Sequence, residues 1–277
     1  MPDFGIFRGF NSKLFSDKLY AGQLPTQLGL IGSDIIGLDT DYKSVINYAT
    51  TQGYTLPSAS QQTLQNQLVV DLKSAGVWSD LDLFYVFATD GDEDFATINW
   101  ANPNAFKCSK INSPTFTTNI GFNSDGSSSY LNTNYNPNSD SANFQLLSNS
   151  LHYYTSNNPS IARHHGTRNA NDDNQILYAQ NIKRHQFTGG VLSNNSNTFF
   201  SSIRNGSSTE QYIDNTLNKT VTNTPTVLPS YDYVICAYNL TGSISLGGSA
   251  EISFFALGDQ ISNSTMYTAW NNYYSSL

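Results

Sequence analysis

The densest group of side chains that could do chemistry is an acidic cluster from Asp90 to Asp94, with the sequence DGDED. Alternating carboxylates suit a hard cation such as Ca²⁺. An EF-hand loop that began at Asp90 would need Gly at its sixth position and Glu at its twelfth, where this chain has Phe95 and Ala101. The sequence therefore excludes an EF-hand and favours a solvated turn after a strand. Binding of Ca²⁺ in another geometry stays open.

A second reactive group is the segment RHHGTR at 163–168, which Asp172 and Asp173 follow. A histidine near a carboxylate can transfer protons or bind a metal ion. We expect a long polar loop here, without a nucleophile in a Gly-x-Ser-x-Gly context. Adjacent residues on a strand would point to opposite faces, which separates His164 from His165. The sequence therefore favours a surface or binding loop, and we expect no catalytic, cofactor-binding or metal-ligating residues in the chain.

Aromatic side chains are the third candidate, since the chain has 17 Tyr and 16 Phe. Exposed Tyr and Trp rings stack on sugar rings, while Asn and Asp bind the hydroxyl groups. The aromatic residues in or beside the predicted strands alternate with others, which is typical of a core. They are His152, Tyr153, Tyr154, Tyr178, Phe199, Phe200, Tyr212 and Tyr231. We expect most of them to be buried, and the sequence assigns no sugar site.

Two helices are expected ahead of the β region. The first covers 39–53, with an apolar face and Gly53 to close it. The second begins at Ser58, an N-cap that Gln61 can complete as a capping box, and ends at Gly76. A last short helix is expected within 262–277, because four apolar side chains would share one face: Met266, Ala269, Trp270 and Tyr273.

Short β-runs fill the chain from Leu83 onward and are separated by turn residues, of which Asn205-Gly206 is the best hairpin signal. The candidate strands are 83–89, 95–100, 115–120, 128–135, 142–155, 175–181, 185–192, 198–204, 210–214, 231–239 and 250–258. No helix is expected between them, which favours antiparallel pairing over βαβ units. The sequence thus predicts a mainly β fold, a two-sheet antiparallel sandwich preceded by an N-terminal arm and two short helices.

The N-terminal segment has no regular period but is rich in apolar side chains, namely Phe4, Ile6, Phe7, Phe10, Leu14 and Phe15. So short a segment cannot build its own core. We interpret it as an anchor that buries its aromatic rings against a partner subunit. The alternative is an arm that packs on its own domain. The predicted domains are an arm at 1–38, a helical connector at 39–79 and the β-sandwich at 80–277.

Composition excludes several classes of partner. The net charge is −8 and no basic run occurs, which disfavours nucleic acid. No segment approaches the ~18 apolar residues of a membrane span. The N-terminus lacks the apolar core of a signal peptide, so we expect the protein to be assembled in a cytoplasm. Cys108 and Cys236 lie in strand-like contexts and are predicted to be buried thiols, rather than a disulfide or a metal pair.

Three stretches resemble a known family. They are LPSASQQTLQNQLVVDLKSAGVWSDLDLFYVFATDGDEDFATINWANP with SPTFTTNIGFNSDGSSSYLNTNYNP, the C-terminal EISFFALGDQISNSTMYTAWNNYYSS, and the opening FGIFRGFNSKLF with GQLPTQLG. The first two resemble the concanavalin A-like lectin/glucanase jelly roll, in the version found in virion proteins of tailed bacteriophages that infect Bacteroidetes. The third is similar to the arm by which such fibre-like proteins attach to the particle. The resemblance implies a jelly roll displayed on a virion, often for glycan recognition.

The resemblance does not imply catalysis. Glucanases of this superfamily carry an E-x-D-x-x-E motif, which this chain lacks. Our first hypothesis is a non-enzymatic virion protein, a tail or head fibre or decoration subunit, that attaches to host-surface polysaccharide. Its expected partners are other virion proteins, bound through the arm, and further copies of itself. The alternatives are a polysaccharide-degrading glycoside hydrolase on the same fold and a purely architectural subunit without a ligand.

Overall fold

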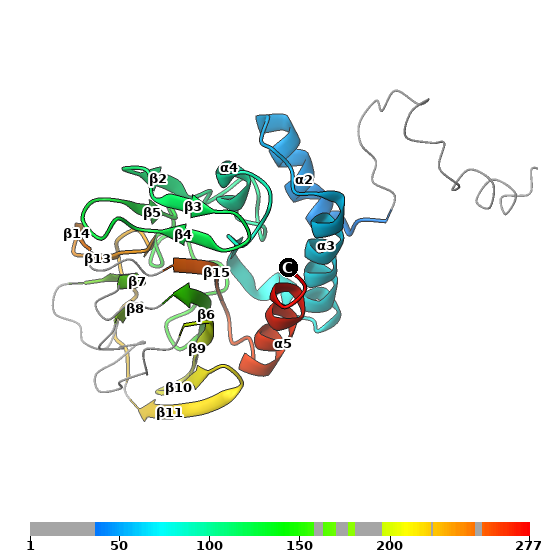
Figure 1. Cartoon of the computed structure of the whole chain (residues 1–277). Helices are drawn as coiled ribbons and strands as arrows, with labels where there is room; N and C mark the ends of the chain where they lie inside the picture. The colour runs from blue at the N-terminus through cyan, green and yellow to red at the C-terminus, as the bar shows by residue number, and fades with distance from the viewer. Residues whose placement is uncertain (1–36, 158–162, 170–176, 181–195, 223, 247–250) are drawn as a thin grey trace, which may run out of the picture. The chain divides into compact units, whose positions relative to one another are not determined.

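The computed structural model describes residues 37–157, 163–169, 177–180, 196–222, 224–246 and 251–277. The chain divides into two units, Met1–Gly37 and Leu38–Leu277, and Figure 1 shows the elements of the second. The predicted anchor residues lie outside the described part of the chain, so the anchoring arm stays a prediction. Within the described ranges, no helix combines the length and the apolar character needed to cross a membrane.

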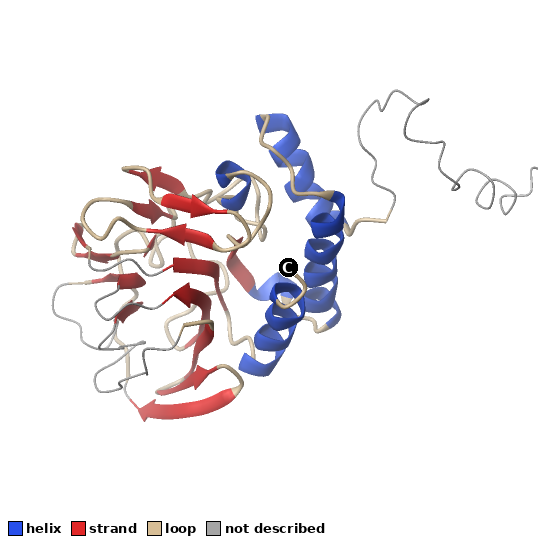
Figure 2. Ribbon diagram, viewed as in Figure 1, coloured by secondary structure: helices blue, strands red, loops and turns tan. Residues whose placement is uncertain are grey.

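The second unit has three layers: a group of helices, a first sheet and a second sheet (Figures 1 and 2). The helices that cover the outer face of the first sheet are α2 (Thr40–Gln52), α3 (Ala59–Ser74) and α5 (Asn263–Tyr274). A single turn of 3₁₀ helix, η1 (Trp78–Asp80), leads into the first strand, and the short α4 (Glu93–Ala96) follows that strand. The fold is mainly β, a jelly-roll-like sandwich, as the sequence predicts.

The first sheet has the order β11-β10-β9-β6-β15-β4-β3, and β1 also pairs with β15. Its strands are β1 (Leu81–Val86), β3 (Thr115–Thr117), β4 (Gly121–Asn123), β6 (Ser148–Asn157), β9 (Thr198–Asn205), β10 (Ser208–Ile213), β11 (Thr216–Thr222) and β15 (Glu251–Gly258). Every pairing described in this sheet is antiparallel. The predicted hairpin at Asn205-Gly206 is confirmed, because Ser208 pairs with Asn205 and joins β9 to β10.

The second sheet has the order β14-β13-β7-β12-β5-β2, and β8 pairs with β7. Its strands are β2 (Ser109–Ile111), β5 (Tyr130–Asn132), β7 (Arg163–Arg168), β8 (Leu177–Gln180), β12 (Val234–Ile235), β13 (Tyr238–Leu240) and β14 (Ser243–Ser245). Pairing here is antiparallel except between β13 and β7, which run parallel. The predicted strand at 231–239 is split in two at Cys236, whose φ is 64°. A strand cannot continue through a left-handed residue.

Strand β1 shows why the run LFYVFA is apolar throughout. Successive side chains point to opposite faces of a strand. Leu83, Tyr85 and Phe87 pack in the core between the sheets, whereas Phe84 and Val86 pack under the helices. From Leu83 onward the strand is buried on both faces, so this part of the sequence has no polar side.

The two N-terminal helices begin and end where the sequence predicts. Asp39 caps α2 by accepting a hydrogen bond from the backbone N–H of Asp41, and Gly53 ends the helix in a left-handed conformation. Ser58 caps α3 by accepting from the N–H of Gln61. The side chain of Gln61 does not close the predicted capping box, since its Oε1 accepts from the backbone N–H of Asp90 at 2.5 Å instead.

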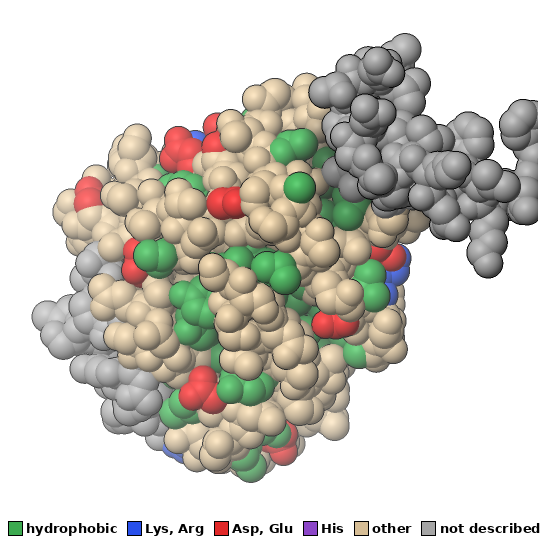
Figure 3. Space-filling model, turned by 45° about the vertical axis from the view of Figure 1, so that its right-hand side comes forward, with side chains coloured by type: hydrophobic (Ala, Val, Ile, Leu, Met, Phe, Trp, Pro, Cys, Tyr) green, Lys and Arg blue, Asp and Glu red, His purple; other side chains and the backbone are tan. Residues whose placement is uncertain are grey.

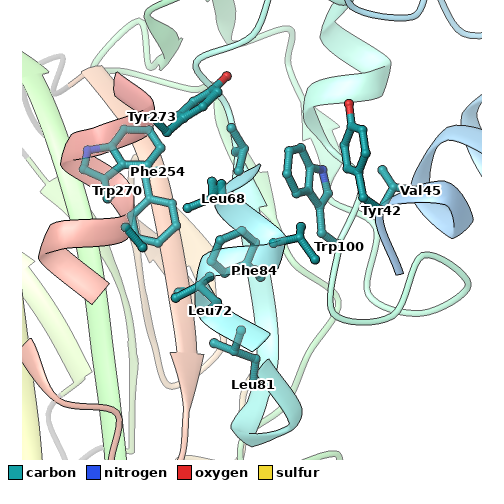
Figure 4. Close-up of a cluster of buried hydrophobic side chains, with 14 of the residues drawn as sticks. Tyr42, Val45, Leu68, Leu72, Leu81, Phe84, Trp100, Phe254, Trp270 and Tyr273 are labelled. Atoms are coloured by element: carbon teal, nitrogen blue, oxygen red, sulfur yellow. The ribbon is translucent and has the colours of Figure 1, made fainter. Parts of the chain in front are cut away.

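The helices and the first sheet share one core, shown in Figure 4. The ring of Trp270 in α5 stacks on Phe254 in β15 with centroids 4.6 Å apart. Phe84 in β1 lies edge-on to the same Phe254 at 5.3 Å. The four residues predicted to form the apolar face of the last helix, Met266, Ala269, Trp270 and Tyr273, are all buried, which confirms that face. The segment predicted as a connector, 39–79, supplies one wall of this core.

A buried glutamine fixes the three helices relative to the sheet. The Oε1 atom of Gln65 accepts a hydrogen bond from the hydroxyl of Tyr42 in α2 at 2.6 Å. Its Nε2 donates to Thr89 Oγ1 at 3.0 Å and to the hydroxyl of Tyr273 in α5 at 3.2 Å. Gln65 is fully buried, so each of these bonds satisfies a group that water cannot reach. This network holds α5 in a fixed place over the first sheet.

Two further sequence-based predictions of local structure are wrong. The segment 95–100 was expected to be a strand, but the side chain of Asp92 caps α4 by accepting from the N–H of Phe95, and the chain turns there. The segment 163–168 was expected to be a polar loop, but it is the strand β7. The strand predicted at 185–192 lies outside the described residues.

Candidate ligand-binding cleft

A cleft of about 290 Å³ opens on the outer face of the first sheet, where β9 and β10 pass the start of α5. We call it the α5 cleft. Most of its lining side chains are polar and uncharged. They are Ile203, Glu210, Tyr212, Asn215, Gln260, Ser262, Asn263 and Ser264.

The hairpin of β9 and β10 forms the floor of the α5 cleft. In its register Glu210 lies opposite Ile203, and Tyr212 lies opposite Ser201. Residues two apart share one face of a strand, so Glu210 and Tyr212 both face the helix side of the sheet. Gly206, with φ of 62°, supplies the left-handed residue that this tight turn needs. The sequence Asn-Gly therefore sets the position of two cleft residues downstream of it.

Asn263 ties the far wall of the cleft to the floor. Its Nδ2 donates to the backbone oxygen of Asp214 at 3.0 Å and to Asn215 Oδ1 at 3.1 Å, both in the turn between β10 and β11. Asn263 is only 3% exposed. Its Oδ1 has no hydrogen-bond partner among the described residues. An unpaired buried acceptor is costly, and here it belongs to a residue that lines the cleft.

Serine hydroxyls line the side of the cleft nearest to the helix. Ser262 caps α5, because its Oγ accepts from the backbone N–H of Thr265 at 3.2 Å. The Oγ atoms of Ser262 and Ser264 lie 3.3 Å apart. Gln260, just before them, donates from its Nε2 to Ser148 Oγ at 3.0 Å. The side chains of Gln260, Ser262 and Ser264 are exposed, so they can reach a ligand.

The one charged group of the lining is paired. The hydroxyl of Tyr212 donates to Glu210 Oε2 at 2.6 Å. This hydrogen bond, together with partial burial, raises the pKa of the Tyr212 phenol to about 12. The phenol therefore stays neutral at physiological pH and keeps the Glu210 carboxylate oriented. Among the described residues that line the cleft, none is Lys or Arg.

The arrangement suits a ligand that has both an apolar ring face and a rim of hydroxyl groups. Tyr212 is half-buried and offers an aromatic surface. Glu210 can accept hydrogen bonds, and Asn215, Gln260 and the serines can both accept and donate. The lining has a single carboxylate among its described residues, whereas glycoside hydrolysis normally needs two. The described lining therefore lacks the carboxylate pair of a glycoside hydrolase, and its groups can form hydrogen bonds and ring contacts with a ligand.

The acidic cluster from Asp90 to Asp94 is used to shape turns. Asp90 Oδ1 accepts from the backbone N–H of Ser58, and Asp92 Oδ2 accepts from that of Thr55. The other two carboxylates form ion pairs with lysines: Glu93 with Lys110 at 2.7 Å, and Asp94 with Lys110 at 3.1 Å and Lys107 at 3.5 Å. Within the described residues, no group of three or more His, Cys, Asp and Glu side chains could hold a metal ion.

The two adjacent histidines are part of the core between the sheets. His164 and His165 are 1% and 0% exposed. His164 Nδ1 lies 3.0 Å from the hydroxyl of Tyr153, and His165 Nδ1 lies 2.6 Å from that of Tyr233. The expected surface or binding loop is therefore wrong for these two residues, because tyrosine partners allow the imidazoles to be buried. The predicted companions Asp172 and Asp173 lie outside the described residues.

Most of the aromatic residues considered as sugar platforms are core, as expected. The buried ones are His152, Tyr153, Tyr154, Phe199 and Phe200. Tyr212 and Tyr231 are half-buried, and the side chain of Tyr178 is not among those described. The sequence includes Tyr212 among the aromatic candidates, but the expectations from sequence did not place it in a site or bring Glu210 beside it. The available signal was the Glu-x-Tyr spacing directly after an Asn-Gly hairpin, which places both side chains on one face.

Both cysteines are buried free thiols, as predicted. Burial raises the pKa of the Cys236 thiol to about 12, and it raises that of Cys108 further. The thiolate is the reactive form, so neither residue is poised for redox or nucleophilic chemistry.

No protein-family model matches the chain, and no curated protein matches it. Among solved structures, the botulinum neurotoxin serotype D binding domain is 12% identical with a TM-score of 0.45, over 71% of this chain and 52% of that one. The receptor binding domain of the botulinum neurotoxin C/D mosaic serotype is 12% identical with a TM-score of 0.46, over 70% and 51%. A mutant Trypanosoma rangeli sialidase displaying trans-sialidase activity is 9% identical with a TM-score of 0.46, over 83% and 39%.

This chain therefore spans about half of the length of the two toxin domains that it resembles. Likeness at this level assigns no ligand and no activity to the chain.

Proposed function

We propose that this protein is a bacteriophage virion structural protein whose β-sandwich binds a host-surface glycan in the α5 cleft. The observation that carries the glycan part of the proposal is the pairing of Tyr212 and Glu210 on one strand face, beside the amides and hydroxyls of the β10–β11 turn and of α5. A sugar ring has an apolar face of C–H groups and a rim of hydroxyls, so it matches both parts of this lining.

Charge argues against other ligand classes. The net charge of −8 and the lack of Lys and Arg among the described cleft residues disfavour phosphate-bearing ligands such as nucleic acid. Ile203 is the one aliphatic side chain in the described lining, so a hydrophobic ligand would find little apolar contact there. Figure 3 shows a face made mostly of uncharged polar side chains and backbone. Such a surface offers hydrogen-bonding groups to hydroxyls at little electrostatic cost.

Replacement of Tyr212 by alanine should weaken glycan binding at least about tenfold, which corresponds to ~1.4 kcal/mol. The change removes the aromatic ring and the hydroxyl group that donates to Glu210 Oε2 at 2.6 Å. Binding to polysaccharide purified from the host surface, measured by calorimetry, would give the two affinities. Tyr231→Ala is the matched control, since Tyr231 is also half-buried and is not among the lining residues. Equal affinities for the wild type and Tyr212→Ala would show that the cleft is not the site.

The virion part of the proposal rests on the resemblance of the three sequence stretches and on the apolar character of the N-terminal segment. In this view, the chain is assembled in the host cytoplasm, docks to other virion proteins through residues 1–37 and forms a homo-oligomer on the particle. The second unit, which contains the helices and the sandwich, begins at Leu38, so removal of the arm leaves its core residues in place.

Deletion of residues 1–37 should abolish incorporation into particles and leave a folded β-sandwich. Mass spectrometry of purified particles measures incorporation, and circular dichroism of the truncated protein checks the fold. Particles that contain the truncated chain at the wild-type level would overturn the anchoring role. If the protein bound no glycan on an array of host glycans, a purely architectural subunit would be favoured instead.

A further inference from the structure

A second hollow adjoins the α5 cleft. A groove of about 440 Å³ lies between α3 and α5, and we call it the α3–α5 groove. Its lining is Asp71, Ala75, Ser264, Thr265, Thr268, Ala269 and Asn272. Ser264 also lines the α5 cleft, and the cleft residue Asn263 and the groove residue Thr265 flank it in the chain. The two hollows therefore meet at Ser264, on the first turn of α5.

The exposed side of α5 forms a polar track along the groove. Ser264, Thr268 and Asn272 recur every four residues, so they lie in a row on one face of the helix. All three are exposed. A helix rises 1.5 Å per residue, so the row is about 12 Å long. This track is longer than one sugar ring, and it starts where the α5 cleft ends.

The charges on this surface select against acidic ligands. Across both hollows the described lining has two carboxylates, Asp71 and Glu210, and no Lys or Arg. An anionic ligand group that lies 4 Å from one of these carboxylates is repelled by about 1 kcal/mol in water, and by more at a partly buried site. Neither carboxylate has a cationic partner in the lining, because Glu210 accepts from Tyr212 and Asp71 accepts from Gln67.

We propose that the α5 cleft and the α3–α5 groove together form one extended site for an internal stretch of an uncharged polysaccharide. One sugar unit stacks on Tyr212, and the units that follow lie over Ser264 and along the track to Asn272. The inference rests on the proposed glycan-binding function and specifies its ligand. A terminal acidic sugar would fill the cleft alone and would face Glu210 without a compensating cation.

The chain-length dependence of binding tests this site. The probes are the neutral glycans of a bacterial glycan array, followed by calorimetry of the best binder as a ladder from one to six sugar units. We expect affinity to rise at least tenfold from one unit to four. Equal affinity for one and for four units, or tighter binding of acidic glycans than of neutral ones, would overturn the extended site. Neither result would contradict the proposed glycan-binding function. If no glycan bound at all, the proposed function would fail as well.

A variant that fills the groove makes the test specific. Thr268→Trp places a large side chain in the α3–α5 groove, away from the residues that line the cleft. This variant should abolish the rise in affinity with the number of sugar units and leave the affinity for a single unit unchanged. Asn271→Trp is the matched control, since Asn271 is exposed on the same helix and lines neither hollow. If the affinities of Thr268→Trp for all six oligosaccharides equalled those of the control, the polysaccharide would not follow this track.

Discussion

Trp270→Ala should lower the free energy of unfolding by about 3–5 kcal/mol, the range for removal of a buried Trp. The Trp270 side chain is 1% exposed, and its ring stacks on Phe254 at 4.6 Å and on Tyr274 at 5.3 Å. Alanine would leave a cavity between α5 and the first sheet. Since α5 and its N-cap supply Ser262, Asn263 and Ser264 of the cleft, we also expect weaker glycan binding in this variant.

Urea unfolding followed by circular dichroism measures the loss. Asn271→Ala is the control, because it changes the next residue on the same helix at an exposed position. It should stay within about 0.5 kcal/mol of the wild type. A loss below about 1 kcal/mol in Trp270→Ala would mean that α5 does not pack on the sheet as described.

Acid should destabilise the protein through His152. The side chain of His152 is fully buried on the helix face of β6, with Nδ1 2.7 Å from Ser201 Oγ and Nε2 without a partner among the described residues. Burial lowers the pKa of this imidazole to about 3. The unfolded chain would bind the proton near the ordinary pKa of about 6.5. The contribution to stability is therefore complete above pH 6.5 and is lost as the pH falls toward 3.

The expected slope from His152 is about 1.4 kcal/mol per pH unit over this window. The comparison is between the wild type and His152→Gln, which cannot take up the proton. Other groups also titrate here; for example, backbone N–H donors at 127–129 lower the pKa of Asp125. They are common to both proteins, so the difference in slope isolates His152. Parallel curves of unfolding free energy against pH would contradict the assignment.

Local signals predicted much of this fold. Ser58 places a side-chain oxygen at the start of α3, and Asn205-Gly206 forms the tight hairpin. These features depend on neighbours within a few residues, which the sequence shows directly. The apolar run at 83–88 also predicted a buried strand, because burial on both faces leaves a continuous apolar segment.

Long-range partners explain what the sequence could not show. The segment RHHGTR looks like a solvated loop, but it is the strand β7, and its two histidines are buried against Tyr153 and Tyr233. The strand expected at 95–100 is absent because Asp92 caps a short helix there. The α5 cleft needs Tyr212 beside Asn263, and these residues are 51 positions apart in the chain. No local sequence pattern predicts that these two residues line the same cleft.

The most direct test is a crystal structure of the protein with its tightest-binding neutral oligosaccharide. We expect one sugar ring against Tyr212, hydroxyls within hydrogen-bonding distance of Glu210 and Asn215, and the next unit over Ser264. An oligosaccharide bound on the second sheet, with the α5 cleft empty, would contradict the assignment of the site.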